Sequence, residues 1–128
     1  MVNVITNVLK QKPSVVFAYL YGSSMESDSY NDIDIAIYAI PESDPFRLSA
    51  DLKLALAEKT GKSPNLFDIR VINHLLIKGD LFSLLYLKEV LSLGSLLIDN
   101  NFSERAAFIE AFGMKYRECQ GLIAEVCA

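Results

Sequence analysis

The sequence is poor in the residues that build several common enzyme sites. Its 128 residues include one histidine, His74, and two cysteines, Cys119 and Cys127. The cysteines are eight positions apart in a predicted helix, about 12 Å along its axis, whereas a disulfide needs Cα atoms within about 7 Å. We therefore expect neither an internal disulfide nor a zinc site. No nucleophile-elbow pattern surrounds Ser23, so a Ser–His–Asp triad is not expected, and His74 is assigned to a loop or a helix cap.

Long apolar runs and positive charge are also lacking. The most apolar region, residues 81–98, is interrupted by Lys88 and Glu89 and falls short of the roughly 20 residues needed to cross a membrane. The chain does not open on a secretory signal pattern, so we expect a cytoplasmic protein that has no membrane partner. The net charge of −4 has the wrong sign for a protein that grips long DNA or RNA directly. Walker-type loops and the Gly-x-Gly-x-x-Gly fingerprint are absent as well.

The rest of the pattern predicts one domain that mixes helices and strands. At 128 residues, the chain is long enough to bury a core of its own without disulfides or a structural metal. Apolar residues at helical spacing indicate helices, and continuous apolar, β-branched runs indicate strands. The predicted helices span residues 3–12, 46–59 and 81–88, and the predicted strands span residues 15–21, 66–72 and 95–98, with a further strand headed by Asp32.

The last predicted helix, residues 102–126, has more apolar surface than one contact needs. Asn101 followed by Glu104 is typical of the capping box that begins a helix. Two neighbouring apolar stripes follow, one made of Phe102, Ala106, Ile109, Tyr116 and Ile123, and the other of Phe108, Phe112, Cys119, Leu122 and Val126. One stripe is expected to pack on the domain. The other contacts a partner chain in a homo- or hetero-oligomer, or is covered by a second layer of the same domain, and both interpretations stay open.

The stretch from Tyr21 to Ile40 organises the chain. In an extended strand side chains alternate between faces, so Asp32 and Asp34 project together while Ile33 projects the other way. Two carboxylates in one small volume repel each other, and such a pair calls for a cation or a shared proton. Magnesium suits oxygen ligands of this kind, usually together with waters and substrate phosphates.

Two further features border this acidic pair. Gly22 has no Cβ, which allows a sharp turn and the close approach of a ligand, and Ser23 adds a hydroxyl donor directly after it. Asp68 lies in an otherwise apolar predicted strand, with Arg70 on the same face. Because a carboxylate in a mostly buried strand is unfavourable unless it is paired or bound to metal, Asp68 is the natural third ligand.

Gly22-Ser23, Asp32-x-Asp34 and the lone strand acid Asp68 resemble the motif of the polymerase-β-like nucleotidyltransferases. The run 67–73, the segment 77–79 and residues 98–100 look more closely like the minimal nucleotidyltransferases, many of which are antitoxins paired with HEPN ribonuclease toxins. The resemblance implies an α/β fold, a mixed β-sheet flanked by helices, with a long C-terminal helix. Within the single domain 1–128, it implies a core at about 13–75 and a C-terminal helical part at about 76–128.

The same resemblance implies an activity. Family members transfer a nucleoside monophosphate, and the antitoxin branch moves AMP from ATP to a tyrosine hydroxyl of the toxin. Carried over, Asp32, Asp34 and Asp68 hold two magnesium ions, Asp68 also helps to activate the hydroxyl, and Gly22 and Ser23 hold the terminal phosphates. The chemistry of the residues agrees, because nucleotidyl transfer needs alignment and neutralised charge but no histidine.

The loop 24–31 departs from the family pattern. It is shorter than usual, and Ser24 stands where an arginine is usual. Arg70 either supplies the missing positive charge or only pairs with Asp68. Two other functions therefore stay open beside transfer to a toxin: nucleotidyl transfer to a small molecule of the aminoglycoside type, and neutralisation of a toxin by contact without catalysis.

Overall fold

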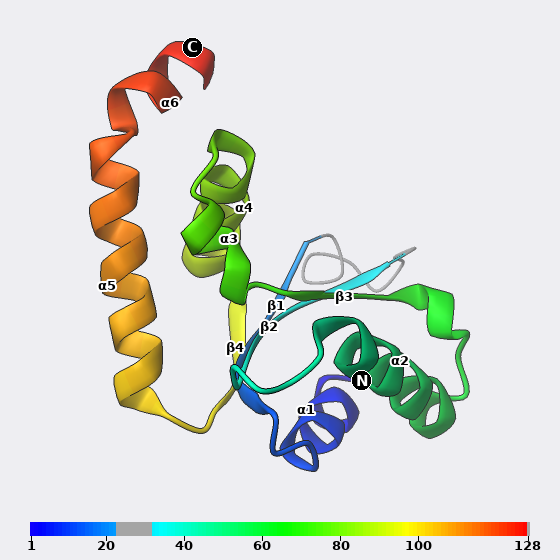
Figure 1. Cartoon of the computed structure of the whole chain (residues 1–128). Coiled ribbons are helices and arrows are strands. Elements are labelled where there is room, and N and C mark those ends of the chain that lie inside the picture. Colours follow the sequence, from blue (N-terminus) through cyan, green and yellow to red (C-terminus); the bar gives the residue numbers. More distant parts are fainter. Residues whose placement is uncertain (23–31, 128) are drawn as a thin grey trace.

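A mixed four-stranded sheet forms the centre of the molecule. The computed structural model describes residues 1–22 and 32–127, and Figure 1 shows how its elements are arranged. The strand order is β3-β2-β1-β4, with β1 antiparallel to β2 and β4, and β2 parallel to β3. This arrangement confirms the predicted mixed sheet. The strands are β1 (Val15–Tyr21), β2 (Ile33–Ala39), β3 (Phe67–Val71) and β4 (Ser95–Asp99).

Helices cover both faces of the sheet. In Figure 1, α1 (Val2–Lys10) and α2 (Pro45–Thr60) lie on one face, and a short 3-10 helix η2 (Pro64–Leu66) leads into β3. On the other face lie α3 (Asn73–Lys78), α4 (Leu81–Leu93) and α5 (Phe102–Glu118), and α6 (Gln120–Cys127) follows α5. Within the described ranges, no helix combines the length and apolar character that a membrane span needs.

The face toward α1 and α2 is packed almost entirely by aliphatic side chains. From β2 it receives Ile33, Ile35 and Ile37, each at most 1% exposed, because alternate side chains of a strand point to the same face. From the helices it receives Leu9 and Leu52, which are fully buried. Two local signals hold α2 in place: Asp44 accepts hydrogen bonds from the first-turn backbone, and Gly61 ends the helix in the left-handed conformation.

The face toward α4 and α5 is packed by aromatic rings. Phe17 of β1 stacks on Tyr38 of β2 with ring centroids 4.9 Å apart, and Phe108 of α5 lies against both rings. Arg105 of α5 donates to a carboxylate oxygen of Asp99 at 2.8 Å. These contacts fasten α5 to the sheet through β1, β2 and β4.

The structure corrects three predictions of secondary structure. His74 lies within helix α3, not in a loop or a cap; the side chain of Asn73 ties the start of this helix to the backbone of Ala39, and Gly79 ends it. Helix α4 runs on to Leu93, because Lys88 and Glu89 are good helix formers that lie exposed on its surface. The long last helix is two helices, α5 and α6, which meet at Cys119.

Helix α5 uses one of its two predicted stripes to pack on the domain. Phe108 and Phe112 are buried in the aromatic cluster with Cys119 beside them, and Tyr116, which was predicted for the other stripe, also packs against this cluster. In the other stripe, Phe102 is 69% exposed and Ala106 is exposed, so none of the described residues forms a second layer over that end of the helix. The side chains of Leu122, Ile123, Val126 and Cys127 lie outside the described part of the structure.

Candidate active site

Parallel pairing of β2 with β3 places two of the predicted acids side by side. Asp34 and Asp68 are direct partners in the register of these strands, so their side chains project to the same face. This is the aromatic face, opposite Ile33, Ile35 and Phe67. Each acid is the second residue of its strand, so the pair lies at the end of the sheet where β2 and β3 begin. Each strand therefore sends alternate side chains into the aliphatic core and, near its start, one acid to the opposite face, where the candidate site lies.

The environment of Asp34 disfavours the charged form of its carboxyl group. Partial burial raises the pKa of its carboxyl group, and the neighbouring carboxylates of Asp68 and Asp32 raise this pKa further. The guanidinium of Arg70 acts in the opposite direction. A cation bound here would reduce the repulsion between these carboxylates and stabilise the charged form of Asp34.

Asp32 lies just before β2 and is exposed. The negative charge of Asp32 raises the pKa of Asp34. In residues 1–22 and 32–127, however, no three His, Cys, Asp or Glu side chains form a group that could hold a metal ion. The structure thus brings Asp34 and Asp68 together and leaves Asp32 at the edge of the pair. The metal-binding role of the three residues stays a prediction.

Gly22 leaves room for the Asp34 carboxylate. Its φ of +88° lies in the left-handed region, and a Cβ atom at this position would collide with Oδ2 of Asp34. Glycine is required here for both reasons. Ser23 and the loop 24–31 lie outside the described residues, so the predicted phosphate-binding hydroxyl has no structural account.

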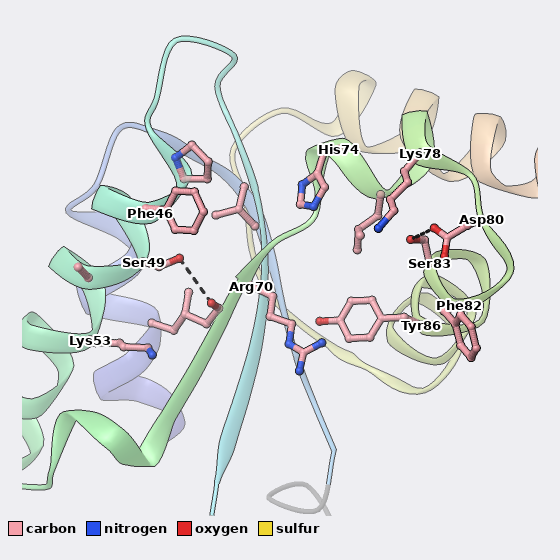
Figure 2. Close-up of a pocket in the computed structure, with 15 residues that line it drawn as sticks. Phe46, Ser49, Lys53, Arg70, His74, Lys78, Asp80, Phe82, Ser83 and Tyr86 are labelled. Atoms are coloured by element: carbon pink, nitrogen blue, oxygen red, sulfur yellow. Dashed lines mark hydrogen bonds between the residues drawn. The ribbon is translucent and has the colours of Figure 1, made fainter.

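An aromatic and cationic network borders the acidic pair. Arg70 lies 3.5 Å from a carboxylate oxygen of Asp68, with side chains 57% and 41% exposed. The guanidinium carbon of Arg70 also lies 5.3 Å from the centroid of the Tyr86 ring, as the orientation of both residues in Figure 2 shows. The hydroxyl groups of Tyr86 and Tyr21 are 2.5 Å apart. Arg70 is therefore held between a carboxylate and an aromatic ring.

Sequence reasoning missed both tyrosines. Tyr21 is the register partner of Asp34, and strand alternation would have placed it on the same face. Nothing in the local pattern pointed to Tyr86, because its position depends on how α4 packs on the sheet. Burial raises the pKa of both hydroxyl groups, that of Tyr86 to about 12.

The comparison with protein families identifies this arrangement. The family model described as polymerase beta, nucleotidyltransferase matches residues 3–102, a range that contains Gly22, Asp32, Asp34 and Asp68. The chain belongs to the polymerase β nucleotidyltransferase family. The predicted family and its fold are thereby confirmed, and the roles of these four residues in this nucleotidyltransferase stay predictions.

Solved structures of toxin–antitoxin complexes share the fold of this nucleotidyltransferase. A chain of the MntA–HepT complex is 21% identical, with a TM-score of 0.59, and the match covers 99% of this chain and 97% of that one. A toxin–antitoxin structure with AMP-PNP gives 23% identity and a TM-score of 0.64, covering 99% and 98%. The tri-AMPylated Shewanella oneidensis HEPN toxin in complex with MNT antitoxin gives 22%, 0.60 and full coverage of both chains. No curated protein matches the sequence.

Proposed function

We propose that this nucleotidyltransferase is an antitoxin that transfers AMP from ATP to a tyrosine hydroxyl of a HEPN toxin. The pairing of Asp34 with Asp68 beside Gly22 is the observation that carries the proposal. The family assignment supports nucleotidyl transfer. The full-length match to a complex of an AMPylated HEPN toxin with an MNT antitoxin supports the acceptor.

The donor set fits magnesium. Asp34 and Asp68, with Asp32 beside them, offer carboxylate oxygens, the ligands that magnesium prefers. Burial, and then the neighbouring carboxylates, raise the pKa of Asp34, and a bound cation would offset both effects. We propose that these residues hold two magnesium ions, which would offset negative charge on the attacking and leaving oxygens.

The chain's own residues divide the remaining tasks. Because Gly22 has no Cβ, the carboxylate of Asp34 can lie directly against its backbone, and we propose that the phosphate oxygens of ATP bind next to this position. Arg70, whose side chain is more than half exposed, brings positive charge to the same end of the sheet. We propose that it replaces the arginine that is usual in the family and that this chain lacks at Ser24. In the transfer, the tyrosine oxygen forms a bond to the α-phosphorus of ATP while the bond to the bridging oxygen of the β-phosphate breaks. Pyrophosphate leaves, and the phenolic proton passes to the carboxylate of Asp68.

Mass spectrometry tests the proposal. The protein is incubated with ATP, magnesium and a HEPN toxin, first that of Shewanella oneidensis and then any HEPN protein encoded by the neighbouring gene. We expect the toxin to gain one or more AMP units with the wild type and with the control Asp51→Asn, an exposed acid on α2. Asp34→Asn and Asp68→Asn should give no gain. An unmodified toxin in every wild-type reaction would refute AMP transfer.

Neutralisation by contact is the second candidate. It is favoured by the exposed stripe of α5, where Phe102 is 69% exposed, and by the Arg70–Asp68 pair, which already neutralises one carboxylate. The two candidates differ in cells. If contact suffices, Asp34→Asn still protects a host against the toxin; if AMP transfer is required, this variant loses protection although it still folds.

A further inference from the structure

A groove with a volume of about 1080 Å³ lies beside the acidic pair. Its floor is the edge strand β3, one wall is the first half of α2, and the other wall is made by α3 and α4. Figure 2 shows the two walls facing each other across β3, with Phe46 on one side and His74 and Tyr86 on the other. We call this cavity the β3 groove. Its volume is slightly above the range of small-molecule pockets, which is about 300–1000 Å³.

Large aromatic side chains stand on both walls of the β3 groove. Phe46 on the α2 wall is 87% exposed, and Phe82 on the α4 wall is 80% exposed. A single exposed apolar residue needs no explanation, but two phenylalanines that line one groove are typical of a binding site. They are suited to anchor apolar side chains of an occupant.

The side chains that line the β3 groove carry more positive than negative charge, although the protein as a whole is negatively charged. Among the described residues, Lys53, Arg70 and Lys78 line it together with one acid, Asp80, whereas the whole chain has a net charge of −4. Arg70 also pairs with Asp68, which lies outside the lining. Asp80 accepts a hydrogen bond from the hydroxyl of Ser83, another lining residue. The surplus of positive charge selects an occupant with negative groups and repels a basic one.

The strand order places the β3 groove opposite the expected nucleotide position. Gly22 follows β1 and Asp68 lies on β3, with Asp34 on the strand between them. Arg70 both lines the groove and pairs with Asp68, so one end of the groove reaches the acidic pair. Phosphates at Gly22 and an acceptor in the groove would approach the carboxylates from opposite sides, as in-line displacement requires.

We infer that the β3 groove binds the segment of the partner protein that carries the acceptor tyrosine, and that this segment is acidic with apolar anchors. The inference rests on the proposed function, because an acceptor segment presupposes AMP transfer to a protein. It adds where the acceptor binds and which chemistry recognises it. ATP is the competing occupant and is separated by the experiment.

Binding of two synthetic peptides tests the charge and the place. Fluorescein-labelled peptides carry one tyrosine flanked by leucines and either glutamates or lysines, and fluorescence anisotropy reports their affinity for the full chain. We expect the acidic peptide to bind about tenfold more tightly than the basic one. Lys53→Glu combined with Lys78→Glu should weaken acidic-peptide binding about tenfold, and so should Phe46→Ala combined with Phe82→Ala.

Matched controls lie outside the β3 groove. Lys62→Glu and Leu54→Ala change an exposed charge and an exposed apolar residue that do not line it, and they should leave peptide affinity unchanged. A fluorescent ATP analogue should bind the groove variants as it binds the wild type. In toxin modification, the groove variants should raise the KM for the toxin about tenfold and leave kcat unchanged.

The outcomes separate the groove from the proposed function. Equal affinity of wild type and groove variants for the acidic peptide would overturn the assignment of the groove. Loss of ATP-analogue binding in the groove variants would make it the nucleoside site and would also overturn the inference. Groove-dependent peptide binding without any AMP transfer by the wild type would support the binding site and refute the transferase.

Discussion

The two faces of the sheet are covered by different kinds of side chain. Toward α1 and α2, the strands present isoleucine and valine, and the helices fill the layer with leucine. Toward α4 and α5, the same strands present Phe17, Tyr19 and Tyr38, and one end of that face carries Asp34 and Asp68. The aliphatic face buries apolar area along the whole sheet. The aromatic face is divided into a packed end and a polar end.

The difference shows how a small domain can hold charged groups without giving up its core. Alternation lets every residue next to Asp34 or Asp68 on its strand point into the aliphatic layer. The rings of Tyr21 and Tyr86 then form the boundary of the polar end, since each has an apolar body and a hydroxyl group. Four substitutions test whether the two faces are as separate as this description requires.

The largest effect is expected at the polar end. Asp34→Asn should reduce AMP transfer about a hundred- to a thousandfold, because a charge that binds and aligns the reacting groups is lost. Stability should not fall. The pKa of Asp34 is raised in the folded state, so this group favours folding below the ordinary pKa of aspartate and loses that effect as pH rises through the folded value.

Thermal unfolding and rate measurements check both parts of this prediction. At pH 7 the unfolding temperature of the variant should equal or exceed that of the wild type. Below about pH 4, where Asp34 is protonated in both the folded and the unfolded state, this difference should disappear. A variant that unfolds earlier at neutral pH would mean that Asp34 supports the fold and that the faces are not separate.

The next effect is expected in the aliphatic layer. Leu52→Ala removes a fully buried side chain and should lower the free energy of unfolding by about 2–5 kcal/mol. Leu54→Ala, on the exposed side of the same helix, should change it by less than about 0.5 kcal/mol. Urea denaturation measures both. At a temperature where Leu52→Ala remains folded, its kcat should equal that of the wild type; a large drop would couple the two faces.

A smaller effect on stability, with a clear effect on activity, is expected at Gly22. Alanine at this left-handed position should cost about 1–2 kcal/mol, and the new methyl group should displace the carboxylate of Asp34. Gly61→Ala is the matched control, since its φ is also positive but no atom lies near the new Cβ. Gly22→Ala should lose at least as much stability as Gly61→Ala, and only Gly22→Ala should lose AMP transfer.

The smallest effect is expected at the boundary between the two ends. Tyr86→Phe removes the hydrogen bond to Tyr21 but keeps the ring beside Arg70, and should cost about 1 kcal/mol. Because the folded state raises the pKa of Tyr86 to about 12, the wild type should lose stability as pH rises from about 10 toward that value. Denaturation experiments at several pH values in this range should show that the free energy of unfolding falls less steeply with pH for Tyr86→Phe than for the wild type. Equal slopes would place the titration elsewhere.

Most of the secondary structure could be predicted because the local signals agree. The strand over 15–21 was predicted with the bounds of β1, since a run of apolar and β-branched residues has few other stable conformations. Helix α2 was predicted from composition and its stop at Gly61. Helix α3 was missed because its start depends on Asn73, whose side chain bonds the backbone of a distant strand. The sequence around Asn73 carries no local signal for this long-range contact.

The sequence by itself determined which residues could do chemistry here: a glycine that only a tight turn explains, an Asp-x-Asp pair and one acid in an apolar strand. These are properties of residue type and alternation, which the chain carries locally. Only the tertiary structure decided that β2 and β3 run parallel in a register that joins Asp34 to Asp68. It also decided that Tyr86 and the β3 groove border them, because strand register and helix docking follow from how all the buried side chains pack together.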